Sequence, residues 1–291
     1  MSRSTIRAAV IGLGRVGWGF SKTHGASHVS CYLENPRTEL VGVADPDRIM
    51  LEDFKAEHPG VAVFRDYERM LYEVRPEIVS VATPTDTHCR IVRNVARYEP
   101  VRVIFAEKPL APTVEEAERM VRTCEEFGVK LACNLTRRWD PAFRRIKGIV
   151  EKGVVGDMLA FSGRFSGDPI GDGVHMADLA NWYRKEDTRI SLLNVPSPYL
   201  VFEADLWGSN GLIRILDNGS EIQLWKPRES RRYAGFRELE RAATLDTGYD
   251  FSRAMRNAVE DLVECATTDK WPDCDGRRGL EALKLCLEVF G

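Results

Sequence analysis

A glycine-rich loop near the N-terminus restricts the fold of this chain more than any other feature of its sequence. Gly12, Gly14 and Gly17 follow an apolar segment that predicts a strand over 6–11, and they open a helical pattern over 15–33. Glycines at this spacing permit a tight turn, let backbone N–H groups approach a pyrophosphate and allow the helix to pack closely on the strand. In this context the loop predicts a dinucleotide-binding domain, with a ligand-free glycine turn as the alternative. The loop residues expected against the cofactor are Gly12, Leu13, Gly14, Arg15 and Val16.

Short apolar segments alternate with helical patterns through the first half of the chain. The segments are rich in Val, Ile and Ala, as in strands that are buried on both faces. Thr113 and Glu116 form a capping box for one of the helices, and Gly128 marks its end. Strands are expected over 6–11, 39–44, 61–64, 78–82, 101–106 and 130–134, and further helices over 48–57, 86–98 and 113–127. This alternation predicts an α/β domain with a doubly wound parallel sheet over residues 1–134.

The pattern changes after about residue 135. Asp140 and Pro141 have the residue types of an N-cap and first helical position, for a helix that ends at Gly153. A turn over 217–219 is typical of an antiparallel hairpin. Strands are expected over 158–166, 189–195, 199–207, 212–216 and 221–225, and closing helices over about 250–267 and 277–289. We therefore expect a second, α+β domain over residues 135–291.

The charge balance argues against several classes of partner. The 291 residues contain 41 Lys and Arg against 44 Asp and Glu, for a net charge of −3, so neither nucleic acid nor a charged membrane surface is expected. No apolar run approaches the roughly 18 residues of a membrane-spanning helix, and residues 3–17 make a poor signal peptide. The seven cysteines are scattered and lack a Cys-x-x-Cys pair. We expect reduced thiols in a cytoplasmic protein, without a disulfide framework or a metal site.

Asp45 ends the second predicted strand, where a carboxylate would accept a hydrogen bond from a ribose 2′-hydroxyl. It lies 28 residues after Gly17, and an insertion over 19–27 accounts for this long spacing. A carboxylate would repel a 2′-phosphate, which favours NAD, whereas the nearby Arg48 keeps NADP as the alternative.

Two polar clusters follow the fourth and fifth predicted strands, at the sheet edge where such folds bind their cofactor. The first runs from Thr83 to His88 and the second is Glu107-Lys108-Pro109. His88 has an alternative role in packing or capping its own helix. The residues expected at the cofactor from these clusters are Thr83, Pro84, Thr85, His88, Glu107 and Lys108.

Together with Gly173-Val174-His175-Met176-Ala177-Asp178, these motifs resemble the Gfo/Idh/MocA family of NAD(P)-dependent oxidoreductases. The resemblance extends over nearly the whole chain and includes Arg137-Arg138-x-Asp140-Pro141. It implies a Rossmann domain followed by a domain with an open, mostly antiparallel sheet. Members of the family commonly pair through that sheet, so a homo-oligomer, either a dimer or a tetramer, is expected.

The resemblance implies catalytic roles for Lys108 and His175. Oxidation of a secondary alcohol needs a base for the hydroxyl proton while hydride leaves for the nicotinamide. The family usually has an aspartate four residues before the histidine, where this chain has Gly171. Asp172 is then either a third catalytic residue or only the N-cap of the helix that contains His175. The residues expected to bind substrate are Lys108, Asn134, Arg137, Arg138 and His175.

The expected function is hydride transfer between a nicotinamide and a hydroxyl or keto carbon of a sugar, cyclitol or sugar nucleotide. The segment between Ser166 and Asp172 is short, which favours an open pocket. Two alternatives are a glycosidase-type enzyme that oxidises its substrate transiently, and a catalytically silent sensor. The intact Glu107-Lys108-Pro109 motif argues against the sensor.

Overall fold

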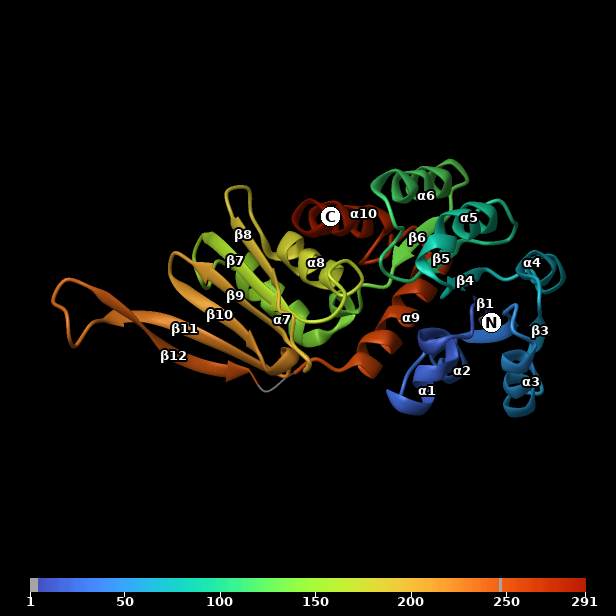
Figure 1. Cartoon of the computed structure of the whole chain (residues 1–291), viewed down its shortest axis with the longest axis horizontal. Coiled ribbons are helices and arrows are strands. Elements are labelled where there is room, and N and C mark those ends of the chain that lie inside the picture. Colours follow the sequence, from blue (N-terminus) through green and yellow to red (C-terminus); the bar gives the residue numbers. More distant parts are fainter. Residues whose placement is uncertain (1–4, 246–247) are drawn as a thin grey trace. The chain divides into compact units, whose positions relative to one another are not determined.

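The computed structural model describes residues 5–245 and 248–291 and divides the chain between two units (Figure 1). One unit comprises Met1–Trp139 with Phe251–Leu280, and the other comprises Asp140–Asp250 with Glu281–Gly291. This division differs from a single boundary after residue 134, because residues 251–280 belong with the first unit.

The first unit contains a six-stranded sheet in the order β3-β2-β1-β4-β5-β6. All neighbouring strands in it are parallel, and this order is that of a Rossmann fold. The strands are β1 (Ile6–Ile11), β2 (Thr38–Ala44), β3 (Ala62–Phe64), β4 (Ile78–Val81), β5 (Val103–Ala106) and β6 (Lys130–Cys133). The predicted doubly wound parallel sheet is confirmed.

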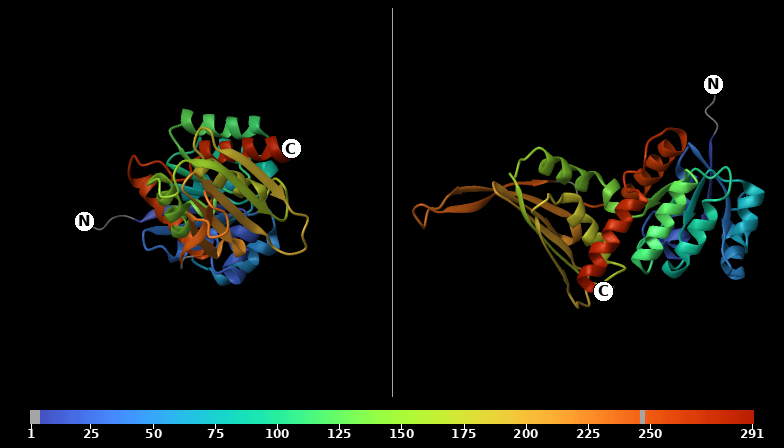
Figure 2. Two further views of the ribbon diagram at one scale, coloured as in Figure 1. Left: turned by 90° about the vertical axis from the view of Figure 1, so that its left-hand side faces the viewer. Right: turned by 90° about the horizontal axis from the view of Figure 1, so that it is seen from above.

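Helices lie on both faces of this sheet (Figure 2). The Thr113 hydroxyl caps α6 by accepting a hydrogen bond from the Glu116 N–H at 3.2 Å. The eight-residue helix α4 was not expected from the sequence, because its pattern is short. The longer helices of the unit are α3 (Arg48–Glu57), α4 (Tyr67–Val74), α5 (Thr85–Val95), α6 (Val114–Glu126) and α9 (Phe251–Thr267).

The single helix expected over 15–33 is wrong. The segment forms a wide helical turn, η1 (Arg15–Gly19), a short helix, α1 (Phe20–Thr23), and a separate helix, α2 (His28–Glu34). Gly25 has a φ of +73°, which interrupts a right-handed helix. Ser27 then starts α2 by a reciprocal capping box with Ser30.

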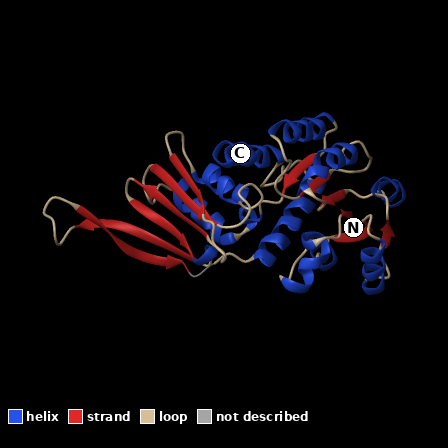
Figure 3. Ribbon diagram, in the orientation of Figure 1, coloured by secondary structure: helices blue, strands red, loops and turns tan. Residues whose placement is uncertain are grey.

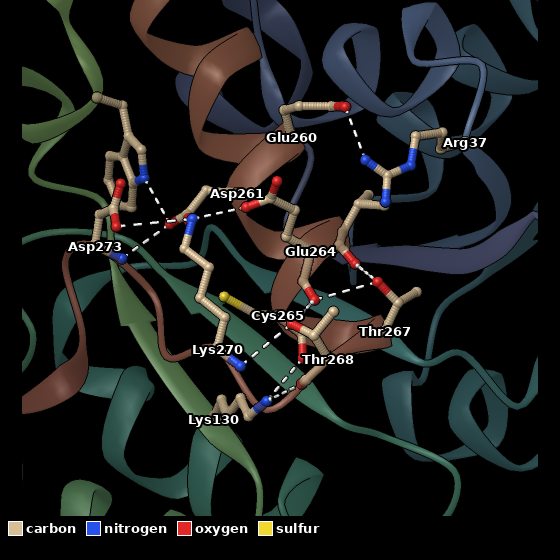
Figure 4. A network of polar contacts seen from close by, with 12 residues as sticks. Arg37, Lys130, Glu260, Asp261, Glu264, Cys265, Thr267, Thr268, Lys270 and Asp273 are labelled. Atoms are coloured by element: carbon tan, nitrogen blue, oxygen red, sulfur yellow. Dashed lines mark hydrogen bonds and ion pairs between the residues drawn. The ribbon is translucent and has the colours of Figure 1, made fainter.

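A network of polar contacts attaches α9 and its following loop to the first unit (Figure 4). The buried carboxylate of Asp261 accepts hydrogen bonds from the indole N–H of Trp139 at 2.8 Å and from the N–H of Asp273 at 2.9 Å. The ammonium of Lys130, on β6, donates to the carbonyl groups of Cys265 and Thr268, at the C-terminal end of α9. These contacts explain why the late segment belongs with the parallel sheet.

The second unit contains a six-stranded sheet (Figure 3). Its strand order is β12-β11-β10-β9-β7-β8. Its pairs are antiparallel except for β7 with β8, so the expected mostly antiparallel sheet is confirmed. Asp140 caps α7 by accepting the N–H of Ala142 at 2.8 Å. The elements are α7 (Pro141–Glu151), β7 (Met158–Phe165), α8 (Gly173–Tyr183), β8 (Arg189–Asn194), β9 (Phe202–Gly208), β10 (Gly211–Leu216), β11 (Glu221–Glu229) and β12 (Arg237–Leu245). The last helix, α10 (Gly276–Phe290), begins in the first unit and ends in the second.

Strand β12 was not expected from the sequence, and β11 is longer than predicted. The two strands form a hairpin at the edge of the second sheet (Figure 1). The polar residues of this hairpin do not give the apolar pattern that predicts a strand. Arg228, for example, forms ion pairs with Glu238 and Glu240 at 3.2 and 3.5 Å.

No helix among the described residues is long and apolar enough to cross a membrane. All seven cysteines are buried and free of disulfide bonds.

Candidate functional site

The glycine loop combines two glycines that the fold requires with one that faces open space. Gly12 has a φ of +93°, and a Cβ there would lie 2.6 Å from the carbonyl oxygen of Ala82. A Cβ on Gly17 would overlap the carbonyl oxygen of Gly12. Gly14, in contrast, has no described atom within 4 Å of an added Cβ. The loop therefore packs tightly on its own strands and leaves an approach to its backbone at Gly14.

Asp45 is held against this loop at the end of β2. One carboxylate oxygen accepts the Leu13 N–H at 2.8 Å, and the other accepts the Asp47 N–H at 2.9 Å. Each oxygen of an ionised carboxylate has a second lone pair, so Asp45 retains the capacity to accept hydrogen bonds from ligand hydroxyl groups.

A cavity of about 530 Å³ opens beside the loop at the carboxyl ends of β1, β2, β3 and β4. This volume is in the range of small-molecule and cofactor sites. Five of the predicted cofactor residues line it, namely Gly12, Gly14, Asp45, Thr83 and Pro84. Arg65, Tyr67 and Arg90 also line it and were not predicted. Arg65 follows β3 directly, so the rule that located Asp45 and Thr83 at strand ends would have found it.

The remaining predicted cofactor residues do not line this cavity. Leu13 is fully buried and contributes its N–H to Asp45. His88 is also buried, with Nε2 2.9 Å from the carbonyl oxygen of Thr83 and Nδ1 3.2 Å from those of Pro109 and Leu110. The other predicted residues outside the lining of this cavity are Arg15, Val16, Thr85, Glu107 and Lys108.

Glu107 is the centre of a buried polar cluster at the end of β5. One carboxylate oxygen accepts hydrogen bonds from His28 Nε2 at 2.8 Å and from Asn134 Nδ2 at 2.6 Å, and the other faces the Lys108 N–H at 3.3 Å. Burial by itself raises the pKa of Glu107, but the hydrogen bonds from His28 and Asn134 and the charge of Lys108 outweigh it and lower the pKa below its ordinary value. Glu107 is therefore ionised at neutral pH.

Lys108 lies directly beyond this carboxylate and is partly exposed between buried neighbours. Its peptide bond to Pro109 is cis. His28 was not predicted from the sequence, since it lies on a helix beyond the glycine loop and 79 residues from its partner Glu107.

The three predicted substrate-binding residues after β6 differ in their surroundings. Asn134 is buried in the Glu107 cluster, and its side-chain oxygen has no hydrogen-bond partner in the described part of the chain. Arg138 is buried and Arg137 is half-buried, both in the short helix η2 (Thr136–Trp139). Their contact with a substrate stays a prediction.

Asp172 and His175 lie in the second unit, at the start of α8. Asp172 occupies the N-cap position, but its side chain makes no capping hydrogen bond. It instead accepts the N–H of Asp168 at 3.0 Å. The simple N-cap interpretation of this side chain is therefore wrong, because the carboxylate folds back onto the preceding loop. His175 is half-buried in the first turn of α8.

The described residues contain no group of three or more His, Cys, Asp or Glu side chains that could hold a metal ion.

Comparison with known proteins connects this site to a family. A family profile described as an oxidoreductase family with an NAD-binding Rossmann fold matches residues 6–135. The scyllo-inositol 2-dehydrogenase (NAD(+)) of Bacillus subtilis is 30% identical over 158 residues, which cover 54% of this chain and 44% of that protein. The inositol 2-dehydrogenase of Rubrobacter xylanophilus is 29% identical over 194 residues, which cover 62% of this chain and 53% of that protein. The chain thus spans about half the length of these curated relatives.

A solved structure extends the similarity in fold to both units. The WlbA dehydrogenase from Bordetella pertussis, in complex with NADH and UDP-GlcNAcA, matches with a TM-score of 0.72 and 19% sequence identity. The match covers 96% of this chain and 93% of that chain.

The different surroundings of Gly14 and Gly17 predict different effects when each glycine is replaced by alanine, on cofactor binding at Gly14 and on stability at Gly17. Gly14→Ala should leave thermal unfolding nearly unchanged and weaken NADH binding by about tenfold or more, because the methyl group enters the open approach to the backbone. Gly17→Ala should lower the free energy of unfolding by about 1–3 kcal/mol, because its methyl group overlaps a backbone carbonyl. Thermal denaturation and NADH fluorescence titration measure the two effects. Equal loss of stability in both variants would contradict this division of roles.

Proposed function

Since the chain belongs to the Gfo/Idh/MocA oxidoreductase family, whose NAD-binding Rossmann fold its residues 6–135 match, we propose that it is a cytoplasmic, NAD-dependent dehydrogenase or reductase. Its substrate is a CH–OH or keto carbon of a sugar, cyclitol or sugar nucleotide. The observation that carries the proposal is the open approach at Gly14, beside Asp45, in a cavity at the carboxyl ends of parallel strands. The names of the relatives, two inositol dehydrogenases and a dehydrogenase in complex with UDP-GlcNAcA, support the substrate class.

The residues of the cavity fit a dinucleotide. Backbone N–H groups around Gly14 would approach the pyrophosphate, and the free lone pairs of Asp45 would accept hydrogen bonds from the ribose hydroxyls. The charge of Asp45 opposes a 2′-phosphate, which favours NAD over NADP. Bound NAD supplies the carbon that accepts or returns hydride.

Lys108 is the leading candidate for the acid and base of the reaction. As a base its amine takes the proton of the substrate hydroxyl, and in the reverse direction its ammonium returns that proton to the carbonyl oxygen. His175 is its partner or orients the substrate, and Asp172 is a third member. Asn134, Arg137 and Arg138 are the proposed substrate contacts from the first unit.

Lys108→Met tests the chemical role. Turnover should fall by about 10²- to 10⁴-fold, because no other group replaces the proton acceptor, while NADH binding should stay within about threefold of the parent. The measurement is NADH formation from NAD over a panel of sugars, polyols and nucleotide sugars, with NADH fluorescence for binding. Lys152→Met, at an exposed lysine, is the matched control and should behave as the parent.

Each outcome of this panel separates the candidate functions. Undiminished turnover in Lys108→Met would exclude the lysine as the essential acid and base. Product formation without net NADH would favour the transient-oxidation enzyme. Silence over the panel from folded, NADH-binding protein would favour the sensor.

Asp45→Asn tests the choice of cofactor. The amide removes the charge with little change in size, so NAD binding should weaken roughly 10- to 100-fold, as expected when a charge-assisted hydrogen bond of about 1.5–3 kcal/mol is lost. The ratio of NADP to NAD affinity should rise. Asp53→Asn, at an exposed position of α3, is the control. An unchanged ratio of affinities would remove Asp45 from cofactor discrimination.

We also propose that the chain forms a homo-oligomer, a dimer or a tetramer, through its second sheet. Leu212 is in register with Trp207 on β9 and Trp225 on β11, so the three share the face opposite the core residues Leu206 and Ile213. Trp207 is 40% exposed on that face. Trp207→Glu should therefore shift the mass measured by sedimentation toward the 32.9 kDa of one chain. A parent protein that already sediments at 32.9 kDa would contradict the proposal.

A further inference from the structure

Two buried histidines hold the backbone on either side of Lys108. His28, on α2, contacts the Glu107 carboxylate directly before the lysine at 2.8 Å. His88, on α5, lies 3.2 Å from the carbonyl oxygens of Pro109 and Leu110 directly after it. The two side chains are 0% and 1% exposed. We infer that His28 and His88 are positioning residues that clamp the Lys108 segment, an inference that rests on the proposed role of Lys108.

The contacts of His28 have a defined direction. The Tyr32 oxygen is 2.8 Å from Ser80 Oγ, which is 2.9 Å from His28 Nδ1. Burial raises the pKa of Tyr32, so its phenol keeps its proton, and Ser80 Oγ is its hydrogen-bond partner in the described structure. Tyr32 therefore donates to Ser80, Ser80 donates to Nδ1, and the Nε2–H of His28 donates to ionised Glu107. Only this direction gives every donor in the series from Tyr32 through Ser80 and His28 an acceptor among its described contacts.

His88 connects the same segment to the cavity. Its Nε2 is 2.9 Å from the carbonyl oxygen of Thr83, which lines the cavity beside the glycine loop. Carbonyl oxygens only accept hydrogen bonds, so the imidazole is the donor in its contacts with Thr83 and with Pro109 and Leu110. The ring therefore ties the loop after β5 to the loop after β4.

Both histidines anchor Lys108 to the end of one strand. Ser80 belongs to β4, and Thr83 lies two residues after the end of that strand. Because the same strand end supports the glycine loop through Ala82, the clamp fixes Lys108 relative to the cofactor cavity. Loss of this orientation should lower kcat more than it changes cofactor affinity.

Two amide substitutions at each histidine provide the test. An asparagine amide reaches the position of ring Nδ1, whereas a glutamine amide reaches that of Nε2. His28→Gln should preserve the contact with Glu107, and His28→Asn should lose it. At His88 the order reverses, because Nδ1 faces the Lys108 segment there. His88→Asn should preserve the contact with Pro109 and Leu110, and His88→Gln should lose it.

Two readouts are measured on the whole protein. In His28→Asn and His88→Gln, hydrogen–deuterium exchange of the peptide covering residues 105–111 should accelerate, and kcat should fall by at least about tenfold with substrate KM and NADH affinity within about threefold. His28→Gln and His88→Asn should stay within about threefold of the parent. His58→Asn is the control, since the ring contacts of His58 in the described part of the chain are with Phe54 and Trp18 and not with this segment.

Glutamine should be tolerated at His28 and asparagine at His88, and this opposite order distinguishes a positioning role of the two histidines from a role in packing alone. Equal effects of both amides at each site, or unchanged exchange in all four variants, would overturn the clamp. Faster exchange with unchanged kcat would overturn its role in positioning Lys108. If the substrate panel is silent, exchange still decides the clamp, and the silence counts against the proposed function alone. If the His28 variants do not fold, Tyr32→Phe removes only the distal hydroxyl, and unchanged exchange in it would overturn the His28 contact chain.

Discussion

The carboxyl end of β4 is the constraint on which the site of the first unit depends. The strand lies between β1 and β5 in the parallel sheet. The glycine loop packs on the carbonyl of Ala82, and Ser80 and Thr83 anchor the two histidines that hold the Lys108 segment. A backbone buried on both faces has little freedom to move. The cofactor cavity and the proposed acid and base therefore share one rigid reference.

The buried charge of Glu107 is the electrostatic cost of this arrangement. An ionised carboxylate out of water is unfavourable unless hydrogen bonds replace its hydration, and His28 and Asn134 provide them here. Because the pKa of Glu107 is lowered on folding, its contribution to stability is present above the carboxyl pKa of the unfolded chain. That contribution is lost as the pH falls through the lower value of the folded state. Glu107 therefore keeps its charge in acid that already protonates carboxyl groups of ordinary pKa.

The sequence predicted those parts of the structure that depend on local pattern. The parallel sheet, the caps Thr113 and Asp140, and the cavity residues Asp45 and Thr83 follow from periodicity, residue type and position at strand ends. His28 could not be found in this way, because its role depends on a contact 79 residues away that no local pattern encodes. Strand β12 was missed because many of its exposed residues are charged and form ion pairs with β11. The interruption of the helix after the glycine loop was missed because it depends on the positive φ of one residue, Gly25. The Asp172 side chain shows the same limit, since residue type left both a cap and a catalytic role open, and its carboxylate accepts the N–H of Asp168 in the neighbouring loop instead of capping α8.

The discontinuous first unit has a consequence for biosynthesis. When the first 139 residues have emerged from the ribosome, every strand of the parallel sheet has been synthesised but α9 has not. At that stage the indole N–H of Trp139 lacks Asp261, and the ammonium of Lys130 lacks the carbonyl groups that it binds in the finished protein. The whole second sheet must emerge before these partners do. The nucleotide-binding half of the molecule, although first in the sequence, is thus among the last parts to be completed.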